Sequence, residues 1–276
     1  MTLAHPHHTR YLINGATDTR LTPLDRGLAY GDGVFRTLKI VNGRPVAWTL
    51  HYSKLVHDCN RLGIVCPAEN LFLTDIDTLF APDETAVAKL MVTRGESARG
   101  YALPVLAQPT RITVRSDYPE YPDEYYANGV RLHLCNLRLS RQPLLAGIKH
   151  LNRLENVLAR SEWSDPTIAD GLLLDDQDRV IACTMSNVFA RYDQRLVTPP
   201  IAECGVAGTT RQRLLESAGN VGLTTEVVEL SLTRLLEADE ILICNSLFGV
   251  WQVVEFNHQH WPTFKTAQQL RALIQE

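Results

Sequence analysis

The sequence predicts an α+β protein with a small N-terminal α/β lobe and a larger C-terminal lobe that has a mainly antiparallel sheet. Runs that alternate with period two, such as VRLHLCNLRL, are interleaved with runs that have apolar residues at helical spacing, such as HYSKLVHDCNRL. Turn signals separate neighbouring strand-like runs at short range, which favours hairpins over parallel crossovers. The chain has 276 residues, 45% of them hydrophobic, which is enough for two modest domains.

The N-terminal half contains the strongest hairpin signal of the chain. Two β-rich runs, GVFRTLKIV and RPVAW, flank Asn42-Gly43, a pair that favours the type I′ turn because both residues tolerate positive φ. The other predicted elements are a strand in YLING with a turn at Asn14-Gly15, helices over residues 50–62 and 68–80, and strands in AVAKLMVTRG and TRITVRSDYP.

The segment SDYPEYPDEYY, residues 116–126, is rich in Pro, acidic residues and Tyr and lacks apolar periodicity. Such composition is typical of a boundary between domains. We therefore predict a small domain at residues 11–117, a linker at 118–125 and a larger domain at 126–276. Residues 1–10 are predicted to be a disordered tail that carries a cluster of three histidines (His5, His7 and His8).

The C-terminal part predicts a second set of alternating elements. VRLHLCNLRLS alternates as a strand, and HLNRLENVLARSEW has the spacing of a helix that begins next to Lys149. ADGLLLDD and RVIACTMSNVFARYD flank Gln177-Asp178 and predict a further hairpin. The remaining predictions are a helix in GTTRQRLLESAGNVG, a strand in ADEILICNS and a C-terminal helix in TAQQLRALIQ.

Composition excludes several classes of function. The chain has 27 basic and 31 acidic residues without a long run of either sign, whereas nucleic-acid binders normally carry a basic patch. The six cysteines show neither C-x-x-C nor metal-ligand spacing, and mostly lie in apolar runs. No apolar run is long enough for a membrane span, and the first residues lack a signal-peptide core. We expect a cytoplasmic protein that binds small molecules, without metal, nucleic acid or membrane.

Lys149 is the first candidate catalytic residue. It follows the apolar run LLAG and precedes the amphipathic stretch HLNRLENVLAR. A lysine at the start of a helix is usually only a solvated surface residue. In an apolar pocket, however, desolvation disfavours the ammonium form, and the neutral amine can attack an aldehyde.

A second candidate site opens the helix that follows ECGVAG. Gly208, Thr209, Thr210 and Arg211 would place free backbone N–H groups and two hydroxyls at a helix start, where phosphate groups bind. The simpler alternative is that a threonine caps the helix. Ser246, at the end of the strand ADEILIC, could add a hydroxyl or could be an ordinary turn residue.

The loop between the strands near residues 90 and 110 carries arginines among glycines. Arg94, Arg99 and Tyr101 lie in TRGESARGY, and arginine binds carboxylates through two parallel hydrogen bonds. An acidic substrate is the functional interpretation, and a solvated loop is the alternative. Upstream, DRG and GDG, residues 25–27 and 31–33, are either part of a site or simply structural turns.

In combination, these motifs resemble a known family. LDRGLAYGDGVFRT, VTRGESARGYALP, LAGIKHLNRLENVLAR, MSNVF, GTTRQ and ADEILICNS follow the order and spacing of the class IV, fold-type IV pyridoxal-phosphate enzymes. The resemblance spans about residues 11–250 and implies a larger lobe that curls into a pseudo-barrel, pyridoxal 5′-phosphate as cofactor and a homodimer. ARGY followed by AGIKHLNRLE is similar to the aminodeoxychorismate lyases, which release pyruvate to make 4-aminobenzoate for folate.

The resemblance also implies roles for single residues. Lys149 matches the lysine that forms the Schiff base with the cofactor and later moves the proton. The positions that match residues around the cofactor are Arg153, Asn187, Gly208, Thr209, Thr210 and Ser246, and those that match the substrate side are Phe35, Arg36, Thr37, Arg99 and Tyr101.

Two positions depart from the family pattern. Relatives carry a glutamate, five residues before the asparagine, that pairs with the pyridine nitrogen of the cofactor, and here that residue is Ala182. Many relatives also carry a phosphate-binding arginine near Thr49. We therefore expect a lyase. The alternatives are a D-amino-acid or branched-chain aminotransferase, and a catalytically idle relative that serves as a binding protein.

Overall fold

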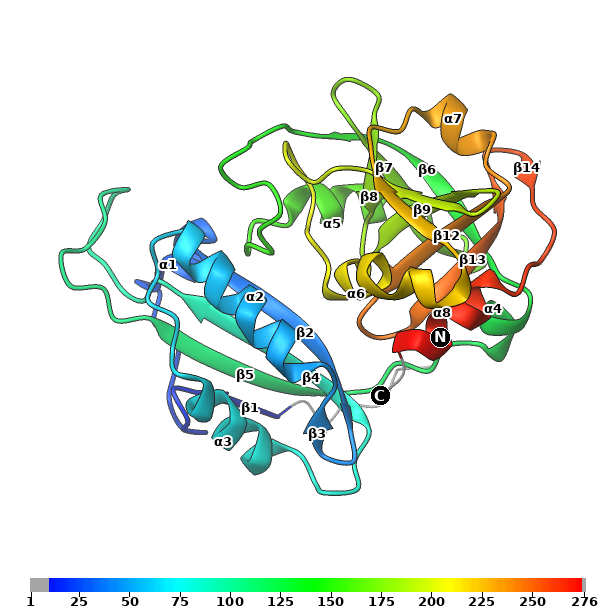
Figure 1. The fold of residues 1–276 in the computed structure, drawn as a ribbon. Coiled ribbons are helices and arrows are strands. Elements are labelled where there is room, and N and C mark those ends of the chain that lie inside the picture. Colours follow the sequence, from blue (N-terminus) through cyan, green and yellow to red (C-terminus); the bar gives the residue numbers. More distant parts are fainter. Residues whose placement is uncertain (1–9, 275–276) are drawn as a thin grey trace. The chain divides into compact units, whose positions relative to one another are not determined.

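A computed structural model describes residues 10–274, so the predicted histidine cluster lies outside the described residues. The predicted tail also lies outside them, except for Arg10, which belongs instead to the first strand. The chain divides into two units (Figure 1). Unit 1 comprises residues up to Glu120 together with Lys149–Asn152, and unit 2 comprises Tyr121–Ile148 and residues from Arg153 onward. The short segment 149–152 therefore leaves its sequence neighbours and packs with the N-terminal unit.

Unit 1 is built on a five-stranded antiparallel sheet with the strand order β1-β5-β4-β2-β3. The predicted type I′ hairpin is confirmed, because Asn42 and Gly43 both have positive φ values between β2 and β3. The elements of unit 1 are β1 Arg10–Ile13, α1 Arg26–Tyr30, β2 Gly33–Val41, β3 Arg44–Pro45, α2 Trp48–Arg61, α3 Glu69–Leu79, β4 Ala86–Thr93 and β5 Thr110–Asp117.

The two faces of this sheet differ. One face is covered by helices: Ile40 and Ala88 pack with Ile76 of α3 in a buried cluster, and α2 lies against β2 (Figure 1). Because side chains alternate along a strand, Phe35 and Thr37 of β2 and their neighbours on β4 point to the opposite face. We call this second surface the helix-free face of the small sheet.

The segment around Lys149 is extended, which corrects the prediction that Lys149 begins a helix. Helix α5 spans only Leu154–Arg160. Residues 149–151 instead pair antiparallel with the first residues of β2: the N–H of Phe35 donates to the carbonyl of Lys149 at 2.9 Å, and the N–H of Leu151 donates to the carbonyl of Gly33 at 2.9 Å. These bonds satisfy the backbone there, so no helical turn is required.

Unit 2 is built on a nine-stranded mixed sheet with the order β11-β10-β9-β12-β13-β6-β7-β8, and β14 pairs with β13. Its strands are β6 Val130–Leu139, β7 Ile168–Asp175, β8 Val180–Cys183, β9 Asn187–Tyr192, β10 Arg195–Thr198, β11 Thr224–Val227, β12 Glu240–Asn245, β13 Gly249–Phe256 and β14 Gln259–His260. Its helices are α4 Asp123–Ala127, α5, α6 Thr209–Ser217, the 3-10 turn Ala218–Val221, α7 Leu232–Leu236 and α8 Thr266–Ile274.

Most strand pairs in this sheet are antiparallel, and those of β6 with β7, β6 with β13 and β10 with β11 are parallel. Register shifts in β6, β7 and β13 bend these strands, in keeping with a sheet that curls on itself. Apolar residues such as Trp251, Phe256 and Val188 fill one core cluster, while Phe189, Leu242 and Leu270 belong to another. The predicted strand RVIACTMSNVFARYD is two strands, β8 and β9, because a bend at residues 184–186 interrupts it.

The predicted linker at 118–125 overlaps an ordered element. Helix α4 begins at Asp123, and Tyr121 and Tyr125 pack edge-on against Trp251 with ring centroids 5.0 and 5.2 Å apart. Burial of these rings anchors the segment to β13. A five-residue helix is too short to show apolar periodicity, which explains why the sequence pattern did not reveal it.

None of the described helices is long and apolar enough to cross a membrane. In residues 10–274 there is also no group of three His, Cys, Asp or Glu side chains that could hold a metal ion.

Candidate active site

Lys149 is held in unit 1 by hydrogen bonds of its backbone N–H and of its backbone carbonyl. Its carbonyl accepts the bond from Phe35, and its N–H donates to Oδ2 of Asp58 at 3.0 Å. Asp58 lies near the end of α2, 91 residues away in sequence. The side chain of Lys149 is half-buried, and the position of its backbone is defined by these two bonds.

Asp58 is one partner of a buried ion pair. Its Oδ2 atom also accepts a bond from Nη2 of Arg36, and both side chains are almost fully buried. Burial lowers the pKa of Arg36, and the charge of Asp58 opposes that shift. A buried charge that loses its partner is strongly destabilising, so the pair holds α2, β2 and the lysine segment in one arrangement.

This pair changes the interpretation of Arg36. The sequence resemblance grouped Arg36 with Phe35 and Thr37 on the substrate side. In the structure Arg36 points toward α2, while Phe35 and Thr37 lie on the helix-free face. Strand alternation makes it impossible for three consecutive residues to share one face. The side chain of Arg36 therefore lies on the face of β2 that packs against α2, where it contacts Asp58. It does not lie on the face that carries Phe35.

Two lysines share the ring of Phe35. Nζ of Lys149 lies 4.6 Å from the ring centroid, and Nζ of Lys89, on β4, lies 5.0 Å from it. Lys89 stands directly opposite Thr37 in the β2–β4 ladder. Burial lowers the pKa of Lys89. The sequence interpretation did not include Lys89, although a lysine between Ala88 and Leu90 in a central strand is unusual enough to be a signal.

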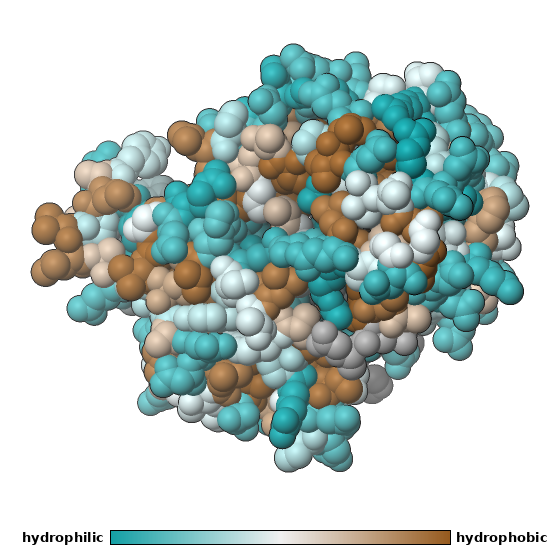
Figure 2. All heavy atoms as spheres, in the orientation of Figure 1, coloured by the Kyte–Doolittle hydropathy of each residue, from teal (hydrophilic) through white to brown (hydrophobic). Residues whose placement is uncertain are grey.

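The loop that carries Arg99 and Tyr101 is tied to α1. The guanidinium of Arg26 donates to the carbonyl oxygens of Gly100, Tyr101 and Ala102 and to the hydroxyl of Ser97, at 3.0–3.3 Å. The side chains of Arg99 and Tyr101 are exposed, Tyr101 by 84%. Several exposed apolar side chains follow them, and Figure 2 shows brown surface on this loop. They are Leu103, Val105 and Leu106.

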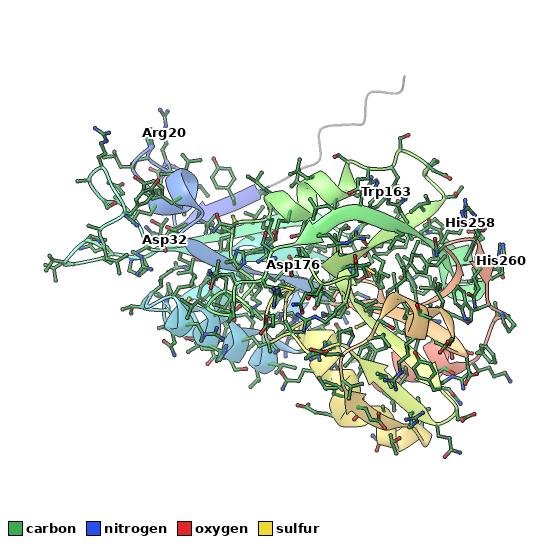
Figure 3. All side chains as sticks on the ribbon, turned by 90° about the horizontal axis from the view of Figure 1, so that it is seen from above. Arg20, Asp32, Trp163, Asp176, His258 and His260 are labelled. Carbon is green, nitrogen blue, oxygen red and sulfur yellow. The ribbon has the colours of Figure 1, made fainter. Side chains whose placement is uncertain are left out.

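The neighbouring arginine, Arg94, has a structural role. It is buried and binds both carboxylate oxygens of Asp32, at 2.7 and 3.0 Å, and two backbone carbonyls. Asp32 (Figure 3) also accepts a bond from Arg26. Asp25 accepts from the hydroxyls of Thr93 and Thr110 and from the N–H of Gly27. The structure thus supports the structural alternative for DRG and GDG, which tie α1 to β4 and β5.

In unit 2, the start of α6 has the features of an anion site. Gly208 is the N-cap, and no side chain caps the helix, so the alternative of a threonine N-cap is wrong. Thr209 and Thr210 are buried in the first turn, which contains no acidic residue. The N–H groups of a helix start and the positive end of the helix dipole favour an anion there.

Asn187 shapes the approach to this helix. Its Nδ2 atom donates to the carbonyl of Val206 at 2.9 Å, and a Cβ at Gly208 would come within 2.1 Å of its Oδ1 atom. Asn187 pairs with Cys244, two residues before Ser246, so β9, β12 and α6 converge here. Ser246 is half-buried in a turn in which Oδ1 of Asn245 accepts two backbone N–H bonds. In unit 2 the structure therefore brings Asn187 and Gly208 together, and Ser246 follows the strand that pairs with β9.

Two further positions complete unit 2. Arg153 precedes α5, and its guanidinium donates to the carbonyl of Ile148 at 3.3 Å. Ala182, on β8, is buried in an apolar cluster with Leu173 and Trp163. Ala182 is therefore an apolar packing position in this chain.

Asp58 is a second residue that sequence interpretation missed. Its signal was present: the buried side of α2 comprises His51, Leu55, Asp58 and Cys59, so a carboxylate interrupts an otherwise mostly apolar stripe. A carboxylate at such a position requires a buried partner. The sequence pattern could indicate that requirement but could not identify Arg36 and the backbone of Lys149 as the partners.

Comparison with known proteins places these features in a family. The model of the family described as "Amino-transferase class IV" matches residues 33–256, and the chain belongs to this family. The aminodeoxychorismate lyase of Vibrio harveyi is 36% identical over 240 residues, which cover 87% of this chain and 89% of that protein. The D-alanine aminotransferase of Listeria innocua is 26% identical over 244 residues, covering 84% and 81% of the two chains.

Solved structures agree with this assignment. The 4-amino-4-deoxychorismate lyase from Pseudomonas aeruginosa is 43% identical and superposes with a TM-score of 0.89, over 95% of this chain and 97% of that one. The branched-chain aminotransferase of Escherichia coli is 18% identical, with a TM-score of 0.84 over 95% and 92% of the chains, and shows the shared fold alone. The predicted α+β fold of fold-type IV is confirmed. Members of the family bind pyridoxal 5′-phosphate.

Proposed function

We propose that the chain is a pyridoxal-phosphate-dependent 4-amino-4-deoxychorismate lyase, which splits its substrate into 4-aminobenzoate and pyruvate. The observation that carries the proposal is the similarity of nearly the whole chain to two such lyases, at 36% and 43% identity, compared with 26% to the D-alanine aminotransferase. Lys149 supports it as a half-buried lysine whose backbone N–H and carbonyl are both hydrogen-bonded.

The residues of the chain fit the cofactor. An aldehyde needs a lysine, and Lys149 is placed by Asp58 and Phe35. A phosphate needs N–H donors, and the uncapped start of α6 offers them next to Thr209 and Thr210. The missing Cβ at Gly208 allows Asn187 to pack directly against the start of the helix. The proposal therefore assigns the covalent role to Lys149 and the phosphate role to residues 208–210, with Asn187, Ser246 and Arg153 beside the cofactor.

When bound, the cofactor supplies an electron sink for the carbon that carries the substrate's amino group. The task of Lys149 is to remove the proton from that carbon and to return a proton to the leaving enolpyruvyl fragment, which becomes pyruvate. One C–H bond and one C–O bond break, the ring becomes aromatic, and no oxidant is consumed. Arg99 and Tyr101 on the exposed loop are assigned to the carboxylates of the substrate.

Ala182 favours elimination over transamination. The family pattern has a glutamate here, and a carboxylate near a pyridinium would stabilise the electron sink. Ala182 is buried among apolar side chains and cannot itself supply such a group. Elimination forms an aromatic ring, and this product stability compensates for a weaker sink. We therefore infer that aminotransferase activity toward D- or branched-chain amino acids is slight.

A direct experiment tests the proposal. The purified protein, loaded with pyridoxal 5′-phosphate, is incubated with 4-amino-4-deoxychorismate, and pyruvate and 4-aminobenzoate are measured together. Equal amounts of both products are expected. Rapid amino transfer from D-alanine to 2-oxoglutarate without pyruvate release from aminodeoxychorismate would instead support the aminotransferase. A protein that neither binds the cofactor nor turns over either substrate would support an idle relative.

We also infer that the protein forms a homodimer in the cytoplasm. Exposed apolar side chains occur both on the loop after Tyr101 and on α5, where Leu154, Val157 and Leu158 are more than half exposed. Apolar surface of this kind marks contact surfaces. Sedimentation equilibrium at micromolar concentration should give twice the 31.0 kDa mass of the chain.

A further inference from the structure

The segment that follows helix α2 runs back along the helix and is fastened to it at two points. The N–H of Ile64 donates to the carbonyl of Cys59 at 2.9 Å, and the hydroxyl of Tyr52 donates to the carbonyl of Pro67 at 3.1 Å. Tyr52 and Cys59 are about two turns apart on α2, so they lie on the same side of the helix. Cys66 lies between the two fastened points and is therefore held beside the side of α2 that carries Cys59.

Cys59 and Cys66 form a pair of interacting thiols. Cys59 is fully buried, whereas Cys66 is half-buried. The thiol of Cys59 donates a hydrogen bond to the sulfur of Cys66, which lowers the pKa of Cys66 and raises that of Cys59. The other four cysteines are buried, and burial raises the pKa of each of them. Among the six cysteines, all of which the structure describes, only Cys66 combines a lowered pKa with partial exposure.

Cys66 lines a groove of about 480 Å³ in unit 1. The other lining residues that matter here lie on one side of α2 and next to Cys66 on the returning segment: Tyr52, Val56, Asn60 and Val65. A buried free cysteine usually serves as a small apolar side chain. This explanation suits Cys59, but it does not suit Cys66, which a small molecule in the groove can reach. Reactive cysteines are accessible, have a low pKa and often lie next to a second cysteine that resolves the first product.

We propose that Cys66 and Cys59 form a dithiol site that reacts with soluble disulfides, with Cys66 as the attacking thiol and Cys59 as the resolving thiol. The thiolate of Cys66 attacks one sulfur of the soluble disulfide, its S–S bond breaks, and one thiolate leaves and takes up the proton that Cys66 lost. Cys59 then attacks the Cys66 sulfur of the mixed disulfide, and its proton goes to the second thiol as that thiol leaves. The soluble disulfide is reduced to two thiols, and the two cysteines are oxidised to one protein disulfide.

This reaction uses neither Lys149 nor the cofactor. The lyase proposal and the dithiol proposal can therefore fail independently, and a measurement of thiol chemistry tests the second without reference to pyruvate release.

The experiment exposes the reduced, cofactor-loaded protein to oxidised glutathione, blocks the remaining thiols with iodoacetamide and identifies the products by peptide mass analysis. In the wild type a disulfide between Cys59 and Cys66 is expected. Cys59→Ala lacks the resolving thiol and should stop at a glutathione mixed disulfide on Cys66. Cys66→Ser should leave Cys59 unmodified, because Cys59 is buried. A wild type that stays reduced, or that keeps a mixed disulfide on Cys66 without forming the protein disulfide, would overturn the proposal.

Alkylation rates give a second test, with Cys204 as the matched control. Burial raises the pKa of Cys204 to about 12, whereas the pKa of Cys66 lies below its ordinary value of 9.0. At neutral pH Cys66 therefore carries at least about 1,000-fold more thiolate, and the lower nucleophilicity of a less basic thiolate cancels about half of this advantage on a logarithmic scale. Cys66 should react with iodoacetamide at least about 30-fold faster than Cys204, and Cys204→Ala should form the disulfide at the wild-type rate. Equal alkylation rates at Cys66 and Cys204 would overturn the assignment of Cys66 as the attacking thiol.

Discussion

The lysine segment of unit 1 and the start of α6 in unit 2 are positioned by different means. Lys149 is held by an ion pair and by backbone bonds to residues far away in sequence, with Asp58 as the common acceptor. The start of α6 is formed by local chain geometry at Gly208 and by one amide side chain, Asn187. Removing one partner of a buried ion pair leaves the other charge without compensation. At a helix start, by contrast, several N–H donors bind the same anion together. The first region should therefore be sensitive to single substitutions and the second tolerant of them.

The largest effect is expected for Lys149→Ala. Pyruvate release should fall below detection, because the substitution removes the amine to which the proposal assigns the covalent role. The backbone bonds to Asp58 and Phe35 do not depend on the side chain, so folding should be retained. Borohydride reduction of the cofactor-loaded wild type, followed by peptide mass analysis, should place the label on Lys149. A label on Lys89, the other lysine over Phe35, would contradict the role assigned to Lys149.

Asp58→Ala is the next test. It leaves the guanidinium of Arg36 buried without its carboxylate, which costs about 3–5 kcal/mol of unfolding free energy. It also removes the acceptor for the N–H of Lys149. Urea unfolding measures the first effect, and pyruvate release at a temperature where the variant is folded measures the second. Asp58→Asn keeps an acceptor and should retain more activity than Asp58→Ala. Wild-type stability of Asp58→Ala would show that the ion pair does not hold this region.

Thr210→Val examines the tolerant region. It removes one hydroxyl and leaves the N–H groups of α6 in place, so cofactor affinity should fall by about 1.5–3 kcal/mol, or roughly 10- to 100-fold. Equilibrium titration with pyridoxal 5′-phosphate measures the change. Thr233→Val is a matched control, because Thr233 is also the second residue of a helix, α7. Equal affinities for both variants and the wild type would place the phosphate elsewhere.

Asp32→Asn should have the smallest effect on pyruvate release, because Asp32 pairs with Arg26 and Arg94, and its effect on stability should depend on pH. Burial raises the pKa of Asp32, but hydrogen bonds from Arg94 and Arg26 outweigh it and leave the pKa below its ordinary value of 3.8. The unfolded chain therefore takes up the proton first as the pH falls. Stability from Asp32 is present at neutral pH and is lost as the pH falls from about 3.8 through the folded pKa. The difference in unfolding free energy between wild type and Asp32→Asn should shrink over that range. A constant difference would mean that the ion pairs contribute nothing.

Turns and periodic elements could be predicted from the sequence because they depend on neighbouring residues. Asn42-Gly43 adopts positive φ at both positions, and α2 and α3 lie within a few residues of their predicted ranges. The phosphate-type start of α6 also follows from a local pattern, a glycine before two threonines. The family could be identified for the same reason, since its motifs are short segments in a fixed order.

Only the tertiary structure decided how Lys149 is held. The apolar periodicity of the stretch after Lys149 predicted a helix that begins there. Pairing with β2 and the bond to Asp58 instead hold residues 149–151 in an extended segment. The sequence resemblance grouped Arg36 with Phe35, but the alternation of side chains along β2 places Arg36 on the other face of the sheet. Lys89 meets Phe35 only because β2 and β4 pair in one register. The sequence by itself therefore determined the class of fold, the family and the local elements. The long-range contacts that arrange its charges depend on packing between segments, which no local pattern encodes.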